Sequence, residues 1–128
     1  MDMREMIRAG RTNYGEKVAL PWAFYEFSKQ FPGFDGHFPG QPVLPGVCML
    51  KAVAATLEDW HGQGIRVEEL RKARFLSPIR PGQPLEVKCV RHEETSEGFT
   101  AHMTLRGGGD RKTSDCIVRY RLRESTEG

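Results

Sequence analysis

The sequence predicts an α+β domain in which one long central helix is wrapped by a curved antiparallel sheet. The first observation is the segment 46–60, which is apolar on nearly every side until its last residues. A helix of that kind must be buried all round. The second is a downstream series of segments in which apolar and polar residues alternate with a period of two, as in strands with one buried face. A domain with a single long helix can bury it only if the sheet curves around it.

The elements before the long helix follow from local composition. Residues 3–9 form a short amphipathic helix that Gly10 ends. Residues 17–27 are rich in aromatic and β-branched side chains and are expected to be extended, although Pro21 weakens the strand or marks an edge. Residues 28–45 contain glycines and prolines at short intervals and are predicted to form a loop.

The long helix begins after Pro45, a residue suited to a first helical turn, and Gly62 and Gly64 stop it. The predicted strands after it span 67–76, 84–92, 98–106 and 112–123. Prolines and a glycine near position 80 separate the first two strands, and a glycine-rich hairpin turn at 107–110 joins the last two.

Length and charge narrow the class of protein. The chain of 128 residues is expected to be a single domain, 1–128, with an N-terminal segment at 1–16 and a flexible tail at 124–128. A net charge of +2 does not favour nucleic-acid binding, and no apolar run is long enough to span a bilayer. The first residues lack the apolar core of a signal peptide.

Three cysteines, Cys48, Cys89 and Cys116, have no metal-ligand spacing and are expected to be small buried hydrophobes. Together with the absence of a signal peptide, they favour a reduced, cytoplasmic protein. No metal site is expected.

One histidine stands apart. His37 lies in the glycine- and proline-rich loop, nine residues before Gly46 begins the apolar helix. Histidine titrates near neutral pH, and a helix N-terminus offers free N–H donors to a developing oxyanion. This layout suits removal of a proton next to a thioester carbonyl. Gly46 has a plain alternative role, which is tight packing at the helix entrance.

The run HFPGQPVLPGV at 37–47 resembles the active-site signature of the 3-hydroxyacyl-acyl-carrier-protein dehydratases. The segment 72–85 is similar to the strand–turn–strand that follows in that family, and the resemblance extends from about Val18 to Leu122. It implies the hot-dog fold, a dimer, and elimination of water without a cofactor. It also implies a substrate carried on a phosphopantetheine arm, as an acyl-carrier-protein or CoA thioester.

The resemblance assigns roles to individual residues. His37 would be the catalytic histidine, and the backbone N–H of Gly46 or Val47 would bind the thioester oxygen. Phe38, Val43, Pro45 and Val47 are assigned to the substrate site, although Phe38 and Val43 would equally suit the core.

Lys51 departs from the family, which has a glutamate or aspartate there that reaches the neighbouring protomer's site. Four hypotheses stay open. Lys51 is the proton donor, since an ammonium has protons to give. The chain is a non-catalytic or heterodimeric carrier-binding subunit whose acid comes from another polypeptide. The pocket runs another thioester reaction, such as hydrolysis. Or Lys51 is a surface lysine at the end of a dimer interface. Glu58 is a poor substitute, roughly 10 Å further along the helix.

The other charged groups receive weaker assignments. His61, His92 and His102 are given no role. The basic residues near position 75 are expected either to steer an acidic carrier protein or to form a solvated face. They are Arg71, Lys72, Arg74 and Arg80.

Overall fold

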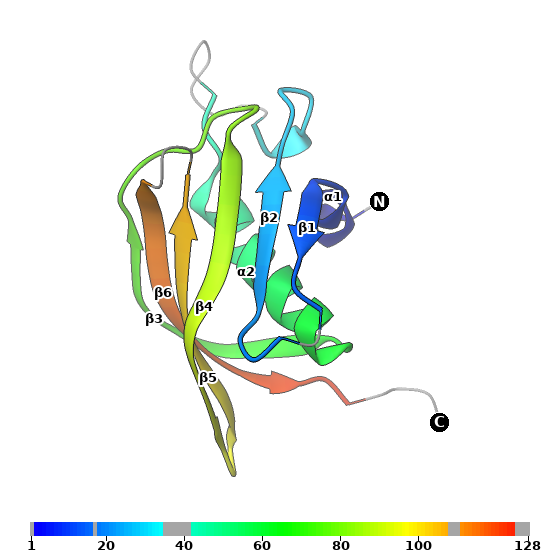
Figure 1. The fold of residues 1–128 in the computed structure, drawn as a ribbon, viewed down its shortest axis with the longest axis vertical. Helices are drawn as coiled ribbons and strands as arrows, with labels where there is room; N and C mark the ends of the chain where they lie inside the picture. The colour runs from blue at the N-terminus through cyan, green and yellow to red at the C-terminus, as the bar shows by residue number, and fades with distance from the viewer. Residues whose placement is uncertain (1, 17, 35–41, 108–110, 125–128) are drawn as a thin grey trace.

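A computed structural model of the chain describes residues 2–16, 18–34, 42–107 and 111–124. The helices are α1 (Met3–Ala9) and α2 (Gly46–His61), with a 3-10 turn, η1 (Pro32–Phe34), before α2. The strands are β1 (Arg11–Tyr14), β2 (Trp22–Glu26), β3 (Ile65–Phe75), β4 (Pro84–Thr95), β5 (Gly98–Arg106) and β6 (Lys112–Leu122). They form one antiparallel sheet in the order β1-β2-β4-β5-β6-β3. Figure 1 shows this sheet curving in front of α2.

The long helix is the centre of the core. Its buried face carries small and medium apolar side chains, among them Ala52, Val53, Ala55 and Leu57. Small side chains let the sheet approach the helix closely and fill the space at high density. The hydroxyl of Tyr25 on β2 lies 3.0 Å from Thr56 Oγ1 and 3.3 Å from the carbonyl oxygen of Ala52, which ties the helix to the sheet.

The alternation in the later strands is confirmed. The inward positions of β4, β5 and β6 are buried, and their neighbours face outward. The inward residues are Leu85, Val87, Cys89, Ala101, Met103, Leu105, Cys116, Val118 and Tyr120. The three cysteines are buried and free, as predicted.

The structure adds two features to the expected elements. Residues 11–14 form β1, which pairs with β2, so β2 lies inside the sheet and Pro21 does not mark an edge. The helix is not buried all round within one chain, because Val47 is 58% exposed and Leu50 is only partly buried. Smaller differences lie at the ends: α2 reaches His61, β3 starts at Ile65 and β4 continues to Thr95.

A network of ion pairs joins α1 to the last turn of α2. Glu58 is buried and accepts hydrogen bonds from Arg4, from Arg8 at 2.8 Å and from the N–H of Ile65 at 2.9 Å. Arg8 also binds Asp59 at 3.1 Å. Burial alone would favour the neutral acid, but the bonds from Ile65, Arg8 and Arg4 prevail and lower the pKa of Glu58. Glu58 therefore holds α1, α2 and the start of β3 together.

We expect Glu58→Gln to lower the free energy of unfolding by roughly 2 kcal/mol, because charged hydrogen bonds are lost at a buried position. Urea unfolding at pH 7 measures the change. The deficit should shrink as the pH falls from the ordinary glutamate pKa toward the lowered pKa of folded Glu58, because the unfolded wild type takes up its proton first, and it should be lost once folded Glu58 is protonated too. Glu26→Gln, at an exposed position of β2, is the control and should change stability by less than about 0.5 kcal/mol. Equal effects of the two changes would contradict the assignment.

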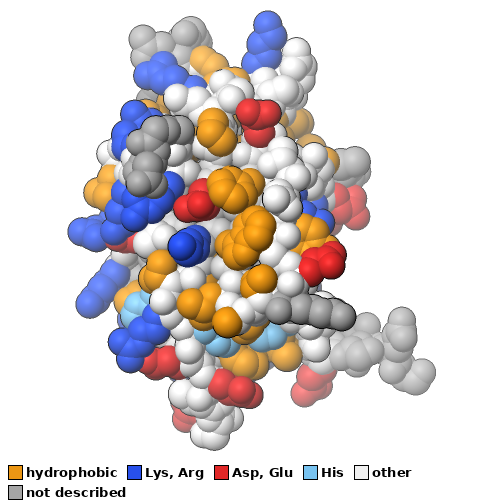
Figure 2. Space-filling model, in the orientation of Figure 1, with side chains coloured by type: hydrophobic (Ala, Val, Ile, Leu, Met, Phe, Trp, Pro, Cys, Tyr) orange, Lys and Arg blue, Asp and Glu red, His pale blue; other side chains and the backbone are white. Residues whose placement is uncertain are grey.

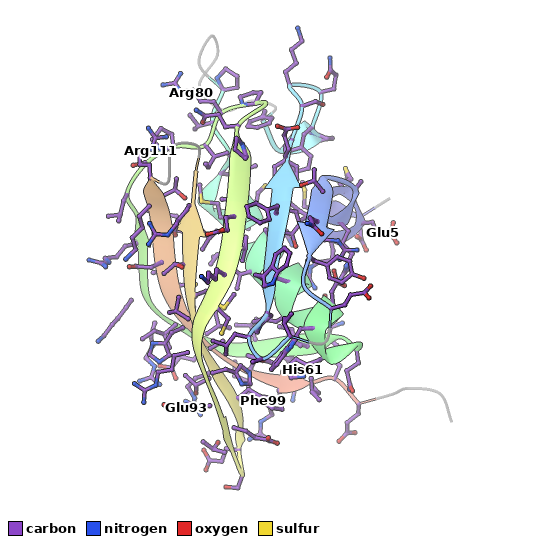
Figure 3. All side chains as sticks on the ribbon, viewed as in Figure 1. Glu5, His61, Arg80, Glu93, Phe99 and Arg111 are labelled. Carbon is purple, nitrogen blue, oxygen red and sulfur yellow. The ribbon has the colours of Figure 1, made fainter. Side chains whose placement is uncertain are left out.

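A second polar cluster closes the other side of the same helix end. The hydroxyl of Tyr120 lies 2.7 Å from Nε2 of His61 and 2.7 Å from Nε2 of His92. The rings of Trp60 and Phe99 pack around the two histidines. Figure 3 labels His61 and Phe99, which lie together at one end of the molecule, far from Arg80 at the other. Both histidines, expected to have no role, therefore bind the helix to the sheet.

We expect this cluster to make stability depend on pH. Burial lowers the pKa of His61 and of His92, and Glu94 opposes the shift only in part. The unfolded state then binds more protons, so the free energy of unfolding should fall as the pH drops from about 7 through the ordinary histidine pKa near 6.5. A His61→Gln/His92→Gln variant should show a flatter dependence in urea unfolding. A wild-type slope in the double variant would refute the prediction.

Candidate functional site

The N-terminus of α2 is left open. Pro45 is its N-cap, with φ −61° and ψ 149°, and makes no side-chain cap. The N–H groups of Cys48 and Met49 donate to the Pro45 carbonyl at 3.0 and 3.2 Å. No acceptor among the described residues takes the N–H of Gly46 or Val47. Two donors at the positive end of a sixteen-residue helix are therefore available to a ligand oxygen.

The segment after β3 holds this helix entrance in place. The N–H of Leu44 donates to the carbonyl of Ile79 at 2.7 Å, and both side chains are buried. A Cβ added to Gly46 would lie only 2.8 Å from Cζ of Phe75, so the glycine permits a close approach of that ring. The packing role considered for Gly46 is therefore present in the structure, next to an N–H group that has no acceptor among the described residues.

Apolar side chains surround the open donors. Val47 is 58% exposed, Phe75 51% and Leu76 53%. An apolar groove of about 220 Å³ continues from Val47 along α2 toward β3. Its walls include Leu50, Val53, Ala54, Val67, Leu70 and Val118. The arrangement can hold an apolar chain whose polar group meets the helix N-terminus.

Lys51 and Arg4 are the cations at this groove. Lys51 is partly buried, and none of the described carboxylates forms an ion pair with it. Burial raises the pKa of the Cys48 thiol, and the charge of Lys51 opposes that shift. Arg4, in contrast, is paired with Glu58. The Lys51 ammonium is thus the cation of the groove that a ligand or a partner chain can engage.

The structure describes only some of the other predicted site residues. His37 and Phe38 lie outside the described residues. Val43 and Pro45 are partly exposed beside the helix entrance, whereas Leu44 between them belongs to the core. Phe75 was missed by sequence reasoning. The only signal was an apolar residue at the end of a strand, which does not reveal a contact with Gly46.

The four basic residues near position 75 are partly neutralised by neighbouring carboxylates. Arg74 binds Asp115 through two bonds of 3.0 and 2.6 Å, which hold the pKa of that carboxyl well below its usual range. Arg71 pairs with Glu69 at 3.1 Å. Lys72 forms no ion pair with a described carboxylate, and Arg80 is exposed. Figure 2 shows Lys and Arg side chains gathering on the side of the molecule where β3 and β6 lie.

The described residues contain no group of three histidine, cysteine or acidic side chains able to hold a metal ion. Within the same residues, none of the helices is long and apolar enough to cross a membrane.

A family model described as ApeI dehydratase (ApeI-like) matches residues 17–114. A 3-hydroxyacyl-[acyl-carrier-protein] dehydratase FabZ from Syntrophobacter fumaroxidans is 40% identical, with 44% of each chain covered. The FabZ protein of Haemophilus influenzae is 35% identical, with 66% of this chain and 64% of the relative covered. The chain thus spans between 44% and 64% of the length of these relatives.

Solved structures show the same fold. The dehydratase heterocomplex ApeI:P from Xenorhabdus doucetiae matches with a TM-score of 0.70 at 22% identity, covering 88% of this chain and 96% of that one. A putative thioesterase, yhdA of Lactococcus lactis, also has a TM-score of 0.70, at 13% identity, covering 98% and 100%. The predicted hot-dog fold is confirmed, and at these identities the likeness concerns the fold alone.

Proposed function

The chain belongs to the ApeI-like dehydratase family, and on that premise we propose that it eliminates water from a 3-hydroxyacyl thioester to give the 2-enoyl thioester. The single observation that carries the proposal is the open start of α2. Two N–H groups without a described acceptor lie among apolar side chains, where an uncharged thioester carbonyl fits. The histidine motif directly precedes this helix in the sequence.

In the proposed reaction His37 removes the proton on the carbon next to the thioester carbonyl. The electron pair of that C–H bond moves into the carbonyl, and the N–H of Gly46 or Val47 stabilises the oxygen as it becomes negative. The C–O bond of the 3-hydroxyl then breaks as the double bond forms. Either His37, returning the proton that it removed, or Lys51 of the neighbouring protomer gives the hydroxyl a proton, so that it leaves as water.

We infer that the substrate arrives on a phosphopantetheine arm, as an acyl-carrier-protein or CoA thioester, and that no cofactor takes part. Phe38, Val43, Pro45 and Val47 would line its path. The exposed Lys72 and Arg80 support docking of an acidic carrier better than Arg71 and Arg74, which are already paired. We also propose that the protein is cytoplasmic, does not bind nucleic acid and does not span a membrane.

We also propose a dimer with a second hot-dog chain. β3 is an edge strand, so one side of its backbone lacks a strand partner in the described sheet. Val67 and Leu70 on β3 are exposed large apolar residues, and with Val47 and Leu50 they line one groove. An apolar groove beside an open strand edge favours association through that edge. A homodimer would be isologous.

A heterodimeric, carrier-binding subunit is the second candidate, and it is favoured by one observation. Lys51 stands where the resemblance to the dehydratase family implies a carboxylic acid. In that case the isolated chain is nearly inactive, and another polypeptide supplies the acid. An acyl thioesterase is a third possibility, which the thioesterase-like fold permits without favouring it.

Turnover of 3-hydroxyacyl and 2-enoyl carrier thioesters tests the proposal directly. We expect His37→Ala to lower dehydration by at least about a hundredfold, because a positioned acid–base group is lost. Circular dichroism and sedimentation should show an unchanged fold and assembly. His102→Ala, at an outward position of β5, is the control and should keep wild-type turnover. Unchanged turnover in His37→Ala would remove this residue from the mechanism.

Lys51 has its own test, which also examines the dimer. If Lys51 is the proton donor, Lys51→Ala should abolish dehydration and leave acyl-carrier binding intact, while Lys51→Glu should keep or raise activity. Exchanging subunits between His37→Ala and Lys51→Ala homodimers should restore about a quarter of wild-type activity, because half the dimers then contain one intact site.

Two results would contradict this account of Lys51. Full activity of Lys51→Ala would remove the lysine from the chemistry. An inactive wild type that becomes active as Lys51→Glu would support the heterodimeric subunit instead.

A further inference from the structure

We propose that Phe75 is a positioning and specificity-determining residue of the thioester site. Its ring shields the N–H groups of Gly46 and Val47 from water and makes the helix N-terminus select a neutral thioester over a free carboxylate. This inference rests on the proposed function and names a residue to which the family signature at 37–47 gives no part.

The contact between the ring and the helix start is close. A Cβ on Gly46 would lie 2.8 Å from Cζ of Phe75, 3.0 Å from Cε1 and 3.2 Å from Cε2. These three atoms form the far end of the ring, so the ring points its tip at the first residue of α2. No larger residue fits at position 46 unless the ring moves.

The backbone that carries the ring is fixed. Phe75 is the last residue of β3 and lies opposite Ser114 on β6. The N–H groups of Leu76 and Ser77 both donate to the carbonyl of Thr113, at 2.7 and 3.2 Å. Thr113 is itself buried and bonded through Oγ1 to the carbonyl of Leu105. The sheet therefore sets the position of the ring relative to the helix.

Packing within the chain does not account for this residue. Half of the Phe75 side chain stays exposed, and so do its apolar neighbours Val47 and Leu76. A cluster of exposed apolar side chains is typical of a binding surface. Here it borders two hydrogen-bond donors that have no described acceptor. The combination of donors and an apolar wall defines what the site can accept.

The wall changes which ligand the donors favour. An open helix N-terminus ordinarily attracts anions, including carboxylates. Beside Phe75 a carboxylate would lose its water to an apolar surface, which is costly for a charged group. A thioester carbonyl is neutral, and its sulfur makes favourable contacts with an aromatic ring. Negative charge then develops only in the transition state, beside an apolar wall that excludes water once the thioester is bound, where the donors act most strongly.

The test compares two ligands and several variants. Calorimetry measures binding of hexanoyl-phosphopantetheine and of hexanoate, and kcat and KM are measured for hydration of the matching 2-enoyl thioester. We expect Phe75→Ala to weaken thioester binding about tenfold while hexanoate binding stays equal or improves, and to lower kcat. Phe75→Leu, which keeps an apolar wall, should lie between wild type and Phe75→Ala. Val90→Ala is the matched control, because Val90 is also 51% exposed but lies on β4.

A pair of variants tests the contact itself. Gly46→Ala should lose activity because the new methyl group displaces the ring, and Phe75→Leu should restore part of that activity, because leucine is shorter. If the losses of activity in the two single variants simply add in the double variant, the proposed contact between the two residues is refuted.

The other outcomes separate this inference from the proposed function. Equal weakening of both ligands in Phe75→Ala would show a merely structural role, and unchanged thioester binding would overturn the inference outright. A wild type that binds the thioester with Phe75-dependent selectivity, but turns nothing over, would support Phe75 and refute the dehydratase. Equal turnover of the thioester by the wild type and by all Phe75 variants would support the dehydratase and refute the role of Phe75. Failure to bind the thioester at all would refute both.

Discussion

The burial of one apolar helix is the constraint on which the rest of the structure depends. Ala52, Ala55 and Leu57 are fully buried and project from more than one side of the helix, so contact with a single flat surface cannot bury them all. A flat sheet covers only one side of a helix, so the sheet must curve to exclude more water from it. The order of the strands follows from the same need, because β4, β5 and β6 supply most of the inward side chains and lie next to one another.

The two ends of this helix are treated in opposite ways. At the C-terminus, Gly62 is in the left-handed region with φ 73°, and its N–H donates to the carbonyl of Glu58. Glu58 and His61 then bind α1, β3 and Tyr120 through their side chains. At the N-terminus the cap has no side-chain bond, and two N–H groups have no acceptor among the described residues. A fold that closes one helix end so fully, and leaves the other open beside apolar side chains, places its unsatisfied donors where a ligand can use them.

How much of this could be predicted from the sequence depends on how local each signal is. The long helix and the later strands carry their periodicity within a few residues, so their type was predicted correctly. β1 consists of Arg-Thr-Asn-Tyr and has no apolar alternation; it is a strand because β2 offers it a free edge. The contact between Phe75 and Gly46 and the cluster around Tyr120 join residues far apart in the chain. Neither is encoded in any short segment, and both appear only when the sheet closes on the helix.

Lys51 connects assembly to chemistry through electrostatics. Its side chain lines an apolar groove, and none of the described carboxylates pairs with it. A partner chain seated on α2 and β3 would remove water from that ammonium, and an uncompensated buried charge costs several kcal/mol. The ammonium would then need an acceptor from the partner or from a bound substrate, such as a carboxylate, an imidazole nitrogen or a substrate hydroxyl. A carboxylate acceptor would form a structural ion pair with a partner subunit. An imidazole or a substrate hydroxyl as acceptor would make Lys51 part of an active site. The need for an acceptor at Lys51 thus limits which chain can cover this surface and links that choice to the chemistry of the covered site.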